Sequence, residues 1–212
     1  KAAAATVLNV TEDHMDRYVD LEDYRQAKLR IYHNAKVGVL NNEDSLTFGE
    51  GENQAEQIVS FAENGADYWL KTENGKQYLM AKDEVILPCE EATLVGRHNY
   101  MNILAATALA QAVGINLDAI RTALRQFKGL DHRFQLAHQA NGVRWINDSK
   151  ATNVGSTVAA LAGLYVEGKL HLLLGGDGKG ADFSELADLI NQPQIICYCF
   201  GRDGAQLAKL SS

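Results

Sequence analysis

The sequence predicts an α/β fold in which parallel strands alternate with helices. Short, mainly apolar runs of the kind found in buried parallel strands recur along the chain; they span residues 6–10, 37–40, 170–174 and 195–200. Residues 170–200 read as strand, helix and strand joined by short loops, which is a βαβ unit. Residues 143–161 pass from an apolar strand through a polar loop into a small-residue helix. Such a connection is a common ligand site, because a helix N-terminus attracts anions.

Composition excludes several functional classes. The chain has 212 residues, 46% hydrophobic and 22% charged, enough for one large or two small globular domains. A net charge of −7 gives no support to a nucleic-acid partner. The sequence has no apolar run of the roughly 18 residues that a membrane span needs. Three cysteines predict neither a disulfide framework nor a zinc site. We therefore expect a reduced, cytoplasmic monomer.

Both ends of the sequence predict a fragment, because it starts inside one strand and stops as a helix begins. The first half predicts an amphipathic helix over residues 21–35 and a hairpin at Asn74-Gly75 between 68–70 and 77–80. A short strand follows at 84–87, then an alanine-rich helix over 99–113. A last helix over 117–127 has Asn116 as its predicted N-cap, and its predicted buried side chains are Ile120, Leu124 and Phe127.

Lys28 is the most unusual residue in the first half of the sequence, because it is a charged residue at an apolar position of the predicted helix. It lies at helical spacing on the apolar stripe of Leu21, Tyr24, Ile31 and Ala35, which predicts an inward-facing lysine. Burial lowers the pKa of a lysine, so the neutral amine becomes available as a base, a nucleophile or a site of carbamate formation. A carbamate offers oxygen ligands of the kind that magnesium prefers. The alternative is that the aliphatic stem packs inward while the ammonium reaches water.

Two asparagines and one arginine are candidates for nucleotide binding. Asn99 and Asn102 are one turn apart at the start of a helix, and their carboxamides can read a purine edge. The alternative is that Asn99 caps the helix and Asn102 is exposed. Residues 128–134 resemble a joint between domains. Arg133 in this joint is placed either to contact a nucleotide or to form a surface salt bridge.

The polar loop after residue 146 can bind an anion or a sugar. Lys150 adds a full positive charge near a helix N-terminus, and Asp148 can accept hydrogen bonds from ribose hydroxyls. The alternative is an ordinary loop in which Asn153 or Thr152 caps the helix.

A glycine loop follows the strand at 170–174. Gly176, Gly178 and Ala181 fit the pattern G-x-G-x-x-A, and Asp203 follows at about the distance of a ribose-binding acid. The loop lacks Walker spacing. Lys179 in it can instead hold a substrate carboxylate. On these residues alone, the chain is a nucleotide- or dinucleotide-binding domain, or a structural fragment with no activity.

Six ordered segments together resemble the Mur ligases of peptidoglycan synthesis; they are 9–18, 27–32, 98–102, 130–134, 145–156 and 172–183. The resemblance implies part of a P-loop-type central ATPase domain over residues 1–129, without its P-loop. It implies a Rossmann-like C-terminal domain over residues 130–212, also truncated. Gln135 departs from the pattern, because close relatives often carry glutamate there.

The resemblance also implies an ATP- and Mg²⁺-dependent amide ligase that acts through an acyl phosphate. The implied substrates are UDP-N-acetylmuramoyl-L-alanine and D-glutamate. His14 and carbamylated Lys28 would bind the metal, and Asn99 and Asn102 would face adenine. The remaining implied groups are Arg133 and Asp148 for phosphate or ribose, the catalytic Lys150, and Thr152 and Lys179 for substrate.

Overall fold

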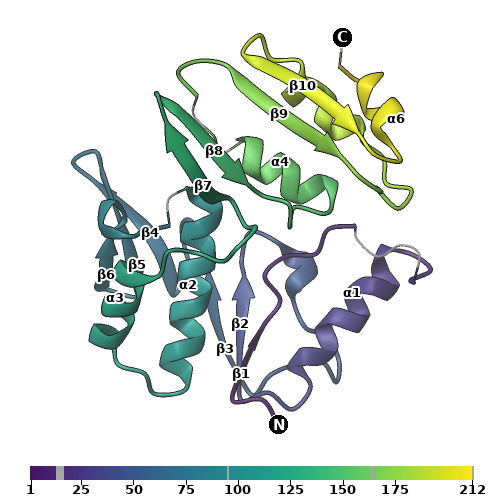
Figure 1. The fold of residues 1–212 in the computed structure, drawn as a ribbon. Coiled ribbons are helices and arrows are strands. Elements are labelled where there is room, and N and C mark those ends of the chain that lie inside the picture. The colour runs from purple at the N-terminus through teal and green to yellow at the C-terminus, as the bar shows by residue number, and fades with distance from the viewer. Residues whose placement is uncertain (13–16, 95, 163, 165, 212) are drawn as a thin grey trace. The chain divides into compact units, whose positions relative to one another are not determined.

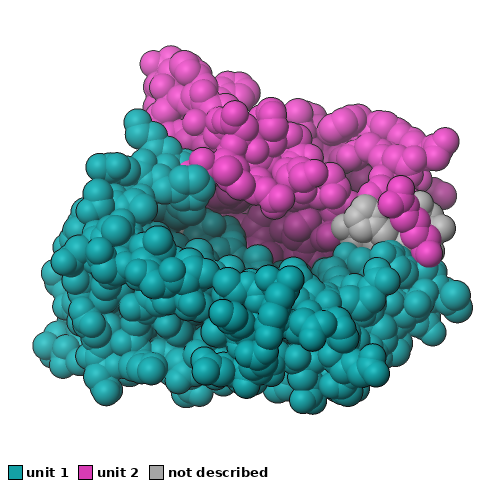
Figure 2. All heavy atoms as spheres, turned by 90° about the horizontal axis from the view of Figure 1, so that it is seen from below, with its two compact units in different colours: residues 1–11, 18–128 teal, residues 12–17, 129–212 magenta. Residues whose placement is uncertain are grey.

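The computed structural model describes residues 1–12, 17–94, 96–162, 164 and 166–211, and it has the predicted α/β character (Figure 1). The chain divides into two compact units (Figure 2). Unit 1 comprises residues 1–11 and 18–128, and unit 2 comprises residues 12–17 and 129–212. Within the described residues, no helix is long and apolar enough to cross a membrane.

Unit 1 is built on a six-stranded mixed sheet in which the strands follow sequence order. The first four strands are parallel and the last two continue the sheet as antiparallel neighbours. The strands are β1 (Ala4–Thr6), β2 (Val37–Asn41), β3 (Gln57–Phe61), β4 (Tyr68–Glu73), β5 (Lys76–Ala81) and β6 (Glu84–Pro88). The carboxyl ends of β1, β2 and β3 therefore meet at one edge, where α/β sheets place ligands.

The two faces of this sheet carry separate hydrophobic cores, because side chains alternate along each strand. On one face, Val39 joins the core under α2 (Arg97–Ala112), in which Leu104 is fully buried. Leu40 packs instead against the core that contains Leu29 and Tyr32. The remaining helical segments of the unit are α1 (Leu21–Leu29), η1 (Arg30–Tyr32), η2 (Ser45–Thr47), η3 (Cys89–Glu91) and α3 (Leu117–Gln126).

Local turn and cap chemistry is confirmed. Asn74 and Gly75 both adopt positive φ angles, 51° and 74°, and they close the β4–β5 hairpin as predicted. The Asn116 side chain accepts a hydrogen bond of 2.8 Å from the Ala119 amide, so it caps α3.

The predicted helix over residues 21–35 is wrong beyond Leu29. The chain tightens there into the 3₁₀ turn η1, which rotates the following side chains relative to an α-helix. Ile31 is consequently 49% exposed. Arg25, a charged residue outside the predicted apolar stripe, is only 6% exposed. Lys28 is half-buried rather than enclosed.

Three smaller expectations were also wrong. The first strand covers Ala4–Thr6 rather than 6–10, and residues 7–10 leave the sheet as a loop. Strand β3 escaped prediction because its first two residues, Gln57 and Ile58, are exposed and weaken the apolar run. Phe127 is 45% exposed because α3 ends before it, at Gln126.

Unit 2 contains the predicted parallel strand pair. It also contains an antiparallel hairpin at Asn141-Gly142, which the sequence predicts between residues 134–138 and 143–147. Apolar side chains from one face of the parallel pair pack against the helices around Leu186, Ile190 and Leu207. The helix that the sequence predicts between these two strands, over residues 184–190, begins as a 3₁₀ turn. The elements are β7 (Gln135–Ala140), β8 (Val143–Asn147), α4 (Val154–Ala162), β9 (Leu170–Gly175), η4 (Ser184–Leu186), α5 (Ala187–Ile190), β10 (Ile195–Phe200) and α6 (Gly204–Ala208).

Arg25 should make a measurable contribution to the stability of unit 1. Its guanidinium donates to the Leu46 and Phe48 carbonyls, at 2.9 and 3.0 Å, and pairs with Glu22 and Glu50. Arg25→Met leaves those carbonyls without this donor, so we expect a loss of about 2 kcal/mol in the free energy of unfolding.

The measurement is urea unfolding followed by Trp69 fluorescence in a Trp145→Phe background, so that only unit 1 is observed. Arg30→Met is the matched control, because Arg30 is exposed and should change stability by less than about 0.5 kcal/mol. Equal effects of the two substitutions would show that the buried contacts of Arg25 are not stabilising.

Candidate functional site

Side chains tie together the loops that follow β1 and β2. The Asp44 carboxylate accepts a hydrogen bond of 2.8 Å from the Val10 amide, and the Asn41 side chain donates to the Leu8 carbonyl at 2.9 Å. Both bonds join segments more than 30 residues apart in sequence. The carboxyl edge of the parallel strands is thus a preformed surface in unit 1.

Lys28 reaches this edge from α1. Its ammonium donates to the Asn9 carbonyl at 3.2 Å and lies 4.5 Å from the centre of the Tyr24 ring. The side chain also lines a shallow concavity of about 320 Å³ together with Thr6, Val7 and Ile31. The stem therefore packs while the ammonium stays accessible, which agrees with the alternative that the sequence left open.

The start of α2 carries the two predicted adenine-binding asparagines. Asn99 is half-buried and Asn102 is exposed, both in the first two turns. The N-cap is Gly96, with φ of 104°, so Asn99 is not the cap. Arg97 anchors this helix start through ion pairs with Glu43, which follows β2, and Glu63, which follows β3.

In unit 2, Asp148 is a structural tie between two loops. Its carboxylate accepts a 3.0 Å hydrogen bond from the Phe134 amide, and the Lys150 amide donates to the His132 carbonyl at 3.0 Å. Phe134 and His132 both have positive φ, 47° and 65°, which are strained for residues with side chains. A carboxylate can accept further bonds, so this tie is compatible with a second role for Asp148.

The other predicted groups of this region are solvent-exposed. They are Arg133, Lys150 and Thr152. Asn153 accepts a 2.8 Å hydrogen bond from the Ser156 amide, so Asn153 rather than Thr152 caps α4. Gln135, the departure from the family pattern, bonds the His132 amide and the Asp131 carboxylate. Its role here is to hold the turn.

The glycine loop after β9 is tied to the turn after β10. The Asp203 carboxylate accepts a 2.6 Å hydrogen bond from the Gly178 amide. This bond holds the glycine loop itself; a carboxylate can accept further bonds, so the suggested ribose role of Asp203 is not tested by it. Lys179 is exposed at the tip of the loop, with φ of 54°.

No metal centre is complete among the described residues. His14 lies outside them, together with Asp13, Met15 and Asp16. In the described part of the chain, no three His, Cys, Asp or Glu side chains converge to hold a metal ion. Burial raises the pKa of the Cys89 thiol to about 11, so this cysteine stays protonated and is a poor nucleophile.

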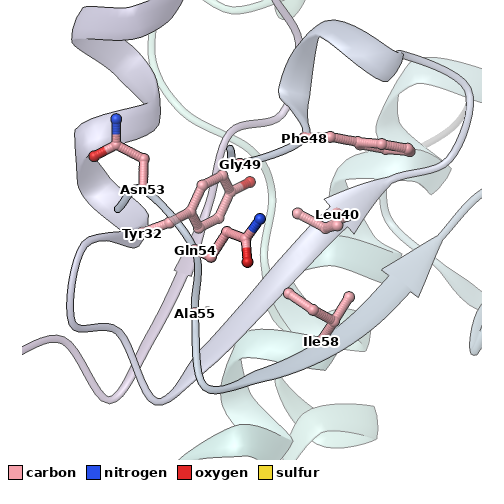
Figure 3. Close-up of a pocket in the computed structure, with 8 residues that line it drawn as sticks. All are labelled: Tyr32, Leu40, Phe48, Gly49, Asn53, Gln54, Ala55 and Ile58. Carbon is pink, nitrogen blue, oxygen red and sulfur yellow. The ribbon is translucent and has the colours of Figure 1, made fainter. Parts of the chain in front are cut away.

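A separate pocket of about 250 Å³ lies in unit 1 (Figure 3). None of the predicted site residues lines it. Its lining combines apolar and amide side chains, with the ring of Tyr32 at one wall; the residues are Tyr32, Leu40, Phe48, Gly49, Asn53, Gln54, Ala55 and Ile58. This lining has no charged group, so the pocket does not fit phosphate chemistry.

Residues 1–110 match the family model of the Mur ligase middle domain, and residues 132–211 match that of the Mur ligase glutamate ligase domain. The chain belongs to the Mur ligase family. Two relatives are named UDP-N-acetylmuramoylalanine--D-glutamate ligase. The one from Haemophilus influenzae (strain PittEE) is 94% identical, and the one from Mannheimia succiniciproducens is 74% identical, each over 212 residues. The chain spans 48% of the length of each of these Mur ligases.

Solved Mur ligase structures share the fold. A MurF structure from Acinetobacter baumannii has a TM-score of 0.78 at 22% identity, covering 99% of this chain and 49% of that one. A MurF ligase from Thermotoga maritima in complex with ADP has a TM-score of 0.67 at 18% identity, covering 98% and 54%. At such identities the likeness shows the α/β fold of the family alone.

The structure adds groups to the site that sequence analysis overlooked. Asp44, Glu43 and Glu63 each follow a parallel strand and organise its loop. For Glu43 and Asp44 a sequence signal was present, namely the polar run that follows the predicted strand at 37–40. Residues at the carboxyl end of a parallel strand lie at the edge of the sheet where ligands bind. Glu63 had no such signal, because β3 was not predicted.

Proposed function

We propose that the full-length protein carrying this chain is an ATP-dependent ligase that joins D-glutamate to UDP-N-acetylmuramoyl-L-alanine. The observation that carries the proposal is 94% identity, over the whole chain, to a relative named as this ligase. The reaction takes place in the cytoplasm, in keeping with three free cysteines. ATP first phosphorylates the substrate carboxylate, and the amine of D-glutamate then displaces phosphate from the acyl phosphate.

Within residues 1–128 we assign nucleotide and metal binding. Asn99 and Asn102 face the adenine, and their accessibility at the start of α2 supports this role. Lys28, as a carbamate, and His14 would hold Mg²⁺. The Asn9 carbonyl, 3.2 Å from the Lys28 amine, is an oxygen donor of the type that Mg²⁺ accepts, so the surroundings of Lys28 fit the ion. Bound there, Mg²⁺ would neutralise negative charge on the phosphoryl group.

In unit 2 the proposal assigns the anionic ends of the substrates. Arg133 and Asp148 bind the nucleotide phosphate or ribose. Lys150 and Thr152 lie in a loop that opens into α4, where an ammonium and a helix N-terminus favour an acyl phosphate. Lys179 holds a carboxylate of D-glutamate. As a cation aimed at oxygens that gain charge, Lys150 lowers the barrier without exchanging a proton, whereas Lys179 binds the incoming D-glutamate.

Product formation tests the function directly. A full-length enzyme carrying these 212 residues should release ADP only when D-glutamate and UDP-N-acetylmuramoyl-L-alanine are both present. The product mass should equal the sum of the two substrates less one water. The 212-residue chain alone should form no product, because no stretch of it fits the complete Walker pattern G-x-x-x-x-G-K-[ST]. ADP release that is independent of D-glutamate would contradict the proposal.

Lys28 tests the metal assignment. In the full-length enzyme, Lys28→Ala should reduce the turnover rate by at least about 100-fold, because the oxygen ligand is lost. A short carboxylic acid such as formate should restore part of the activity, since it can occupy the place of the carbamate. Lys36→Ala is the control, because Lys36 is exposed on the following loop. Loss without any rescue would indicate that Lys28 acts as a plain cation.

A further inference from the structure

The loops at the carboxyl ends of β9 and β10 pack backbone against backbone. The Gly176 amide donates to the Phe200 carbonyl at 3.2 Å, and the Asp203 amide donates to the Gly176 carbonyl at 3.1 Å. A Cβ atom added to Gly201 would lie 2.6 Å from the Gly176 nitrogen. This contact leaves no room for a side chain, so the two loops pack directly together.

Asp203 adds the charged contact to this pair of loops. Its Oδ2 accepts the Gly178 amide at 2.6 Å, a short bond of the charge-assisted kind. A Cβ at Gly178 would lie 3.3 Å from the same oxygen and 2.3 Å from the Phe183 ring, so only glycine allows this approach. The Asp203 side chain thus holds Gly178, the residue immediately before Lys179.

The backbone at Lys179 needs such support. Lys179 has φ of 54°, a left-handed conformation that is unfavourable for a residue with a side chain. Its amide donates to the Asp177 carboxylate at 2.9 Å, and Asp177 pairs with Arg202 at 2.7 Å. The turn after β10 therefore holds both residues that precede Lys179.

We propose that Asp203 is a positioning residue that fixes the orientation in which Lys179 meets a substrate carboxylate. The inference rests on the proposed function, which assigns Lys179 to D-glutamate. Asp203 touches no substrate. Its carboxylate holds the Gly178 amide, so that the loop does not have to become ordered when the substrate binds.

The first test measures the Gly178 amide. Asp203→Asn keeps the shape of the side chain and the backbone contacts of residue 203, but it removes the charge from the acceptor. In the full-length enzyme, hydrogen exchange of the Gly178 amide, followed by NMR, should accelerate by about 10-fold or more. Asp188→Asn makes the same charge change on the exposed side of α5 and should leave Gly178 unaffected. Equal exchange in both variants would overturn the proposal.

The second test separates positioning from general damage. Asp203→Asn should raise the KM for D-glutamate by about 10-fold and change kcat and the KM for ATP less than about twofold, because only one binding loop is loosened. A parallel loss in all three constants would overturn the positioning role.

Lys179→Ala completes the set and should raise the KM for D-glutamate at least as much as Asp203→Asn does. An unchanged KM in this variant would overturn the positioning proposal, because Lys179 would then not meet the substrate. The ligase function would still stand if product formation continued to depend on D-glutamate. The two failures are therefore distinguishable.

Discussion

The candidate sites depend on one recurring interaction, an aspartate carboxylate that accepts a backbone amide from a neighbouring loop. Asp44 holds the Val10 amide, Asp148 holds the Phe134 amide and Asp203 holds the Gly178 amide. Each bond joins segments that are distant in sequence. Hydrogen bonds to charged groups contribute about 1.5–3 kcal/mol, more than neutral ones, so these loops are fixed before any ligand arrives. The aspartates organise the surroundings of the exposed candidate groups.

This arrangement places the proposed chemistry on rigid supports. Lys28 projects from a helix towards the Asn9 carbonyl. Lys179 lies on a loop that Asp203 holds at the preceding residue, Gly178. Arg97 ties the start of α2 to the ends of β2 and β3. The proposed ligase forms an acyl phosphate on one substrate, and the amine of the other substrate then attacks it. Such an enzyme has to hold several anions while water is excluded. Preformed loops reduce the conformational entropy that is lost when these anions bind.

Short-range sequence signals predicted much of the fold. The predictions that were wrong concern segments whose structure is determined by contacts between distant parts of the chain. The Asn74-Gly75 turn and the Asn116 cap are short-range chemistry and were confirmed. The predicted apolar stripe assumed one regular helix to residue 35, but η1 breaks the period after Leu29 and leaves Ile31 exposed. Within α1 the buried polar residue is Arg25, whereas Lys28 is half-buried. Burial of Arg25 depends on contacts that are distant in sequence, because the carbonyls of Leu46 and Phe48 accept hydrogen bonds from its guanidinium. Most candidate site residues were identified from local chemistry and received their roles from the family resemblance. The hydrogen bonds that hold them, such as that between Asp203 and Gly178, are visible only in the folded chain.

The central claim is that the nucleotide binds at the groups assigned to it in the two units, and a hydrogen-exchange footprint tests it most directly. Amide exchange of the full-length enzyme would be compared with and without Mg²⁺ and ADP. The account predicts slower exchange in residues 96–102 and in residues 131–134, where Asn99 and Arg133 lie. Slower exchange confined to residues 48–55, around the pocket beside Tyr32, would contradict it.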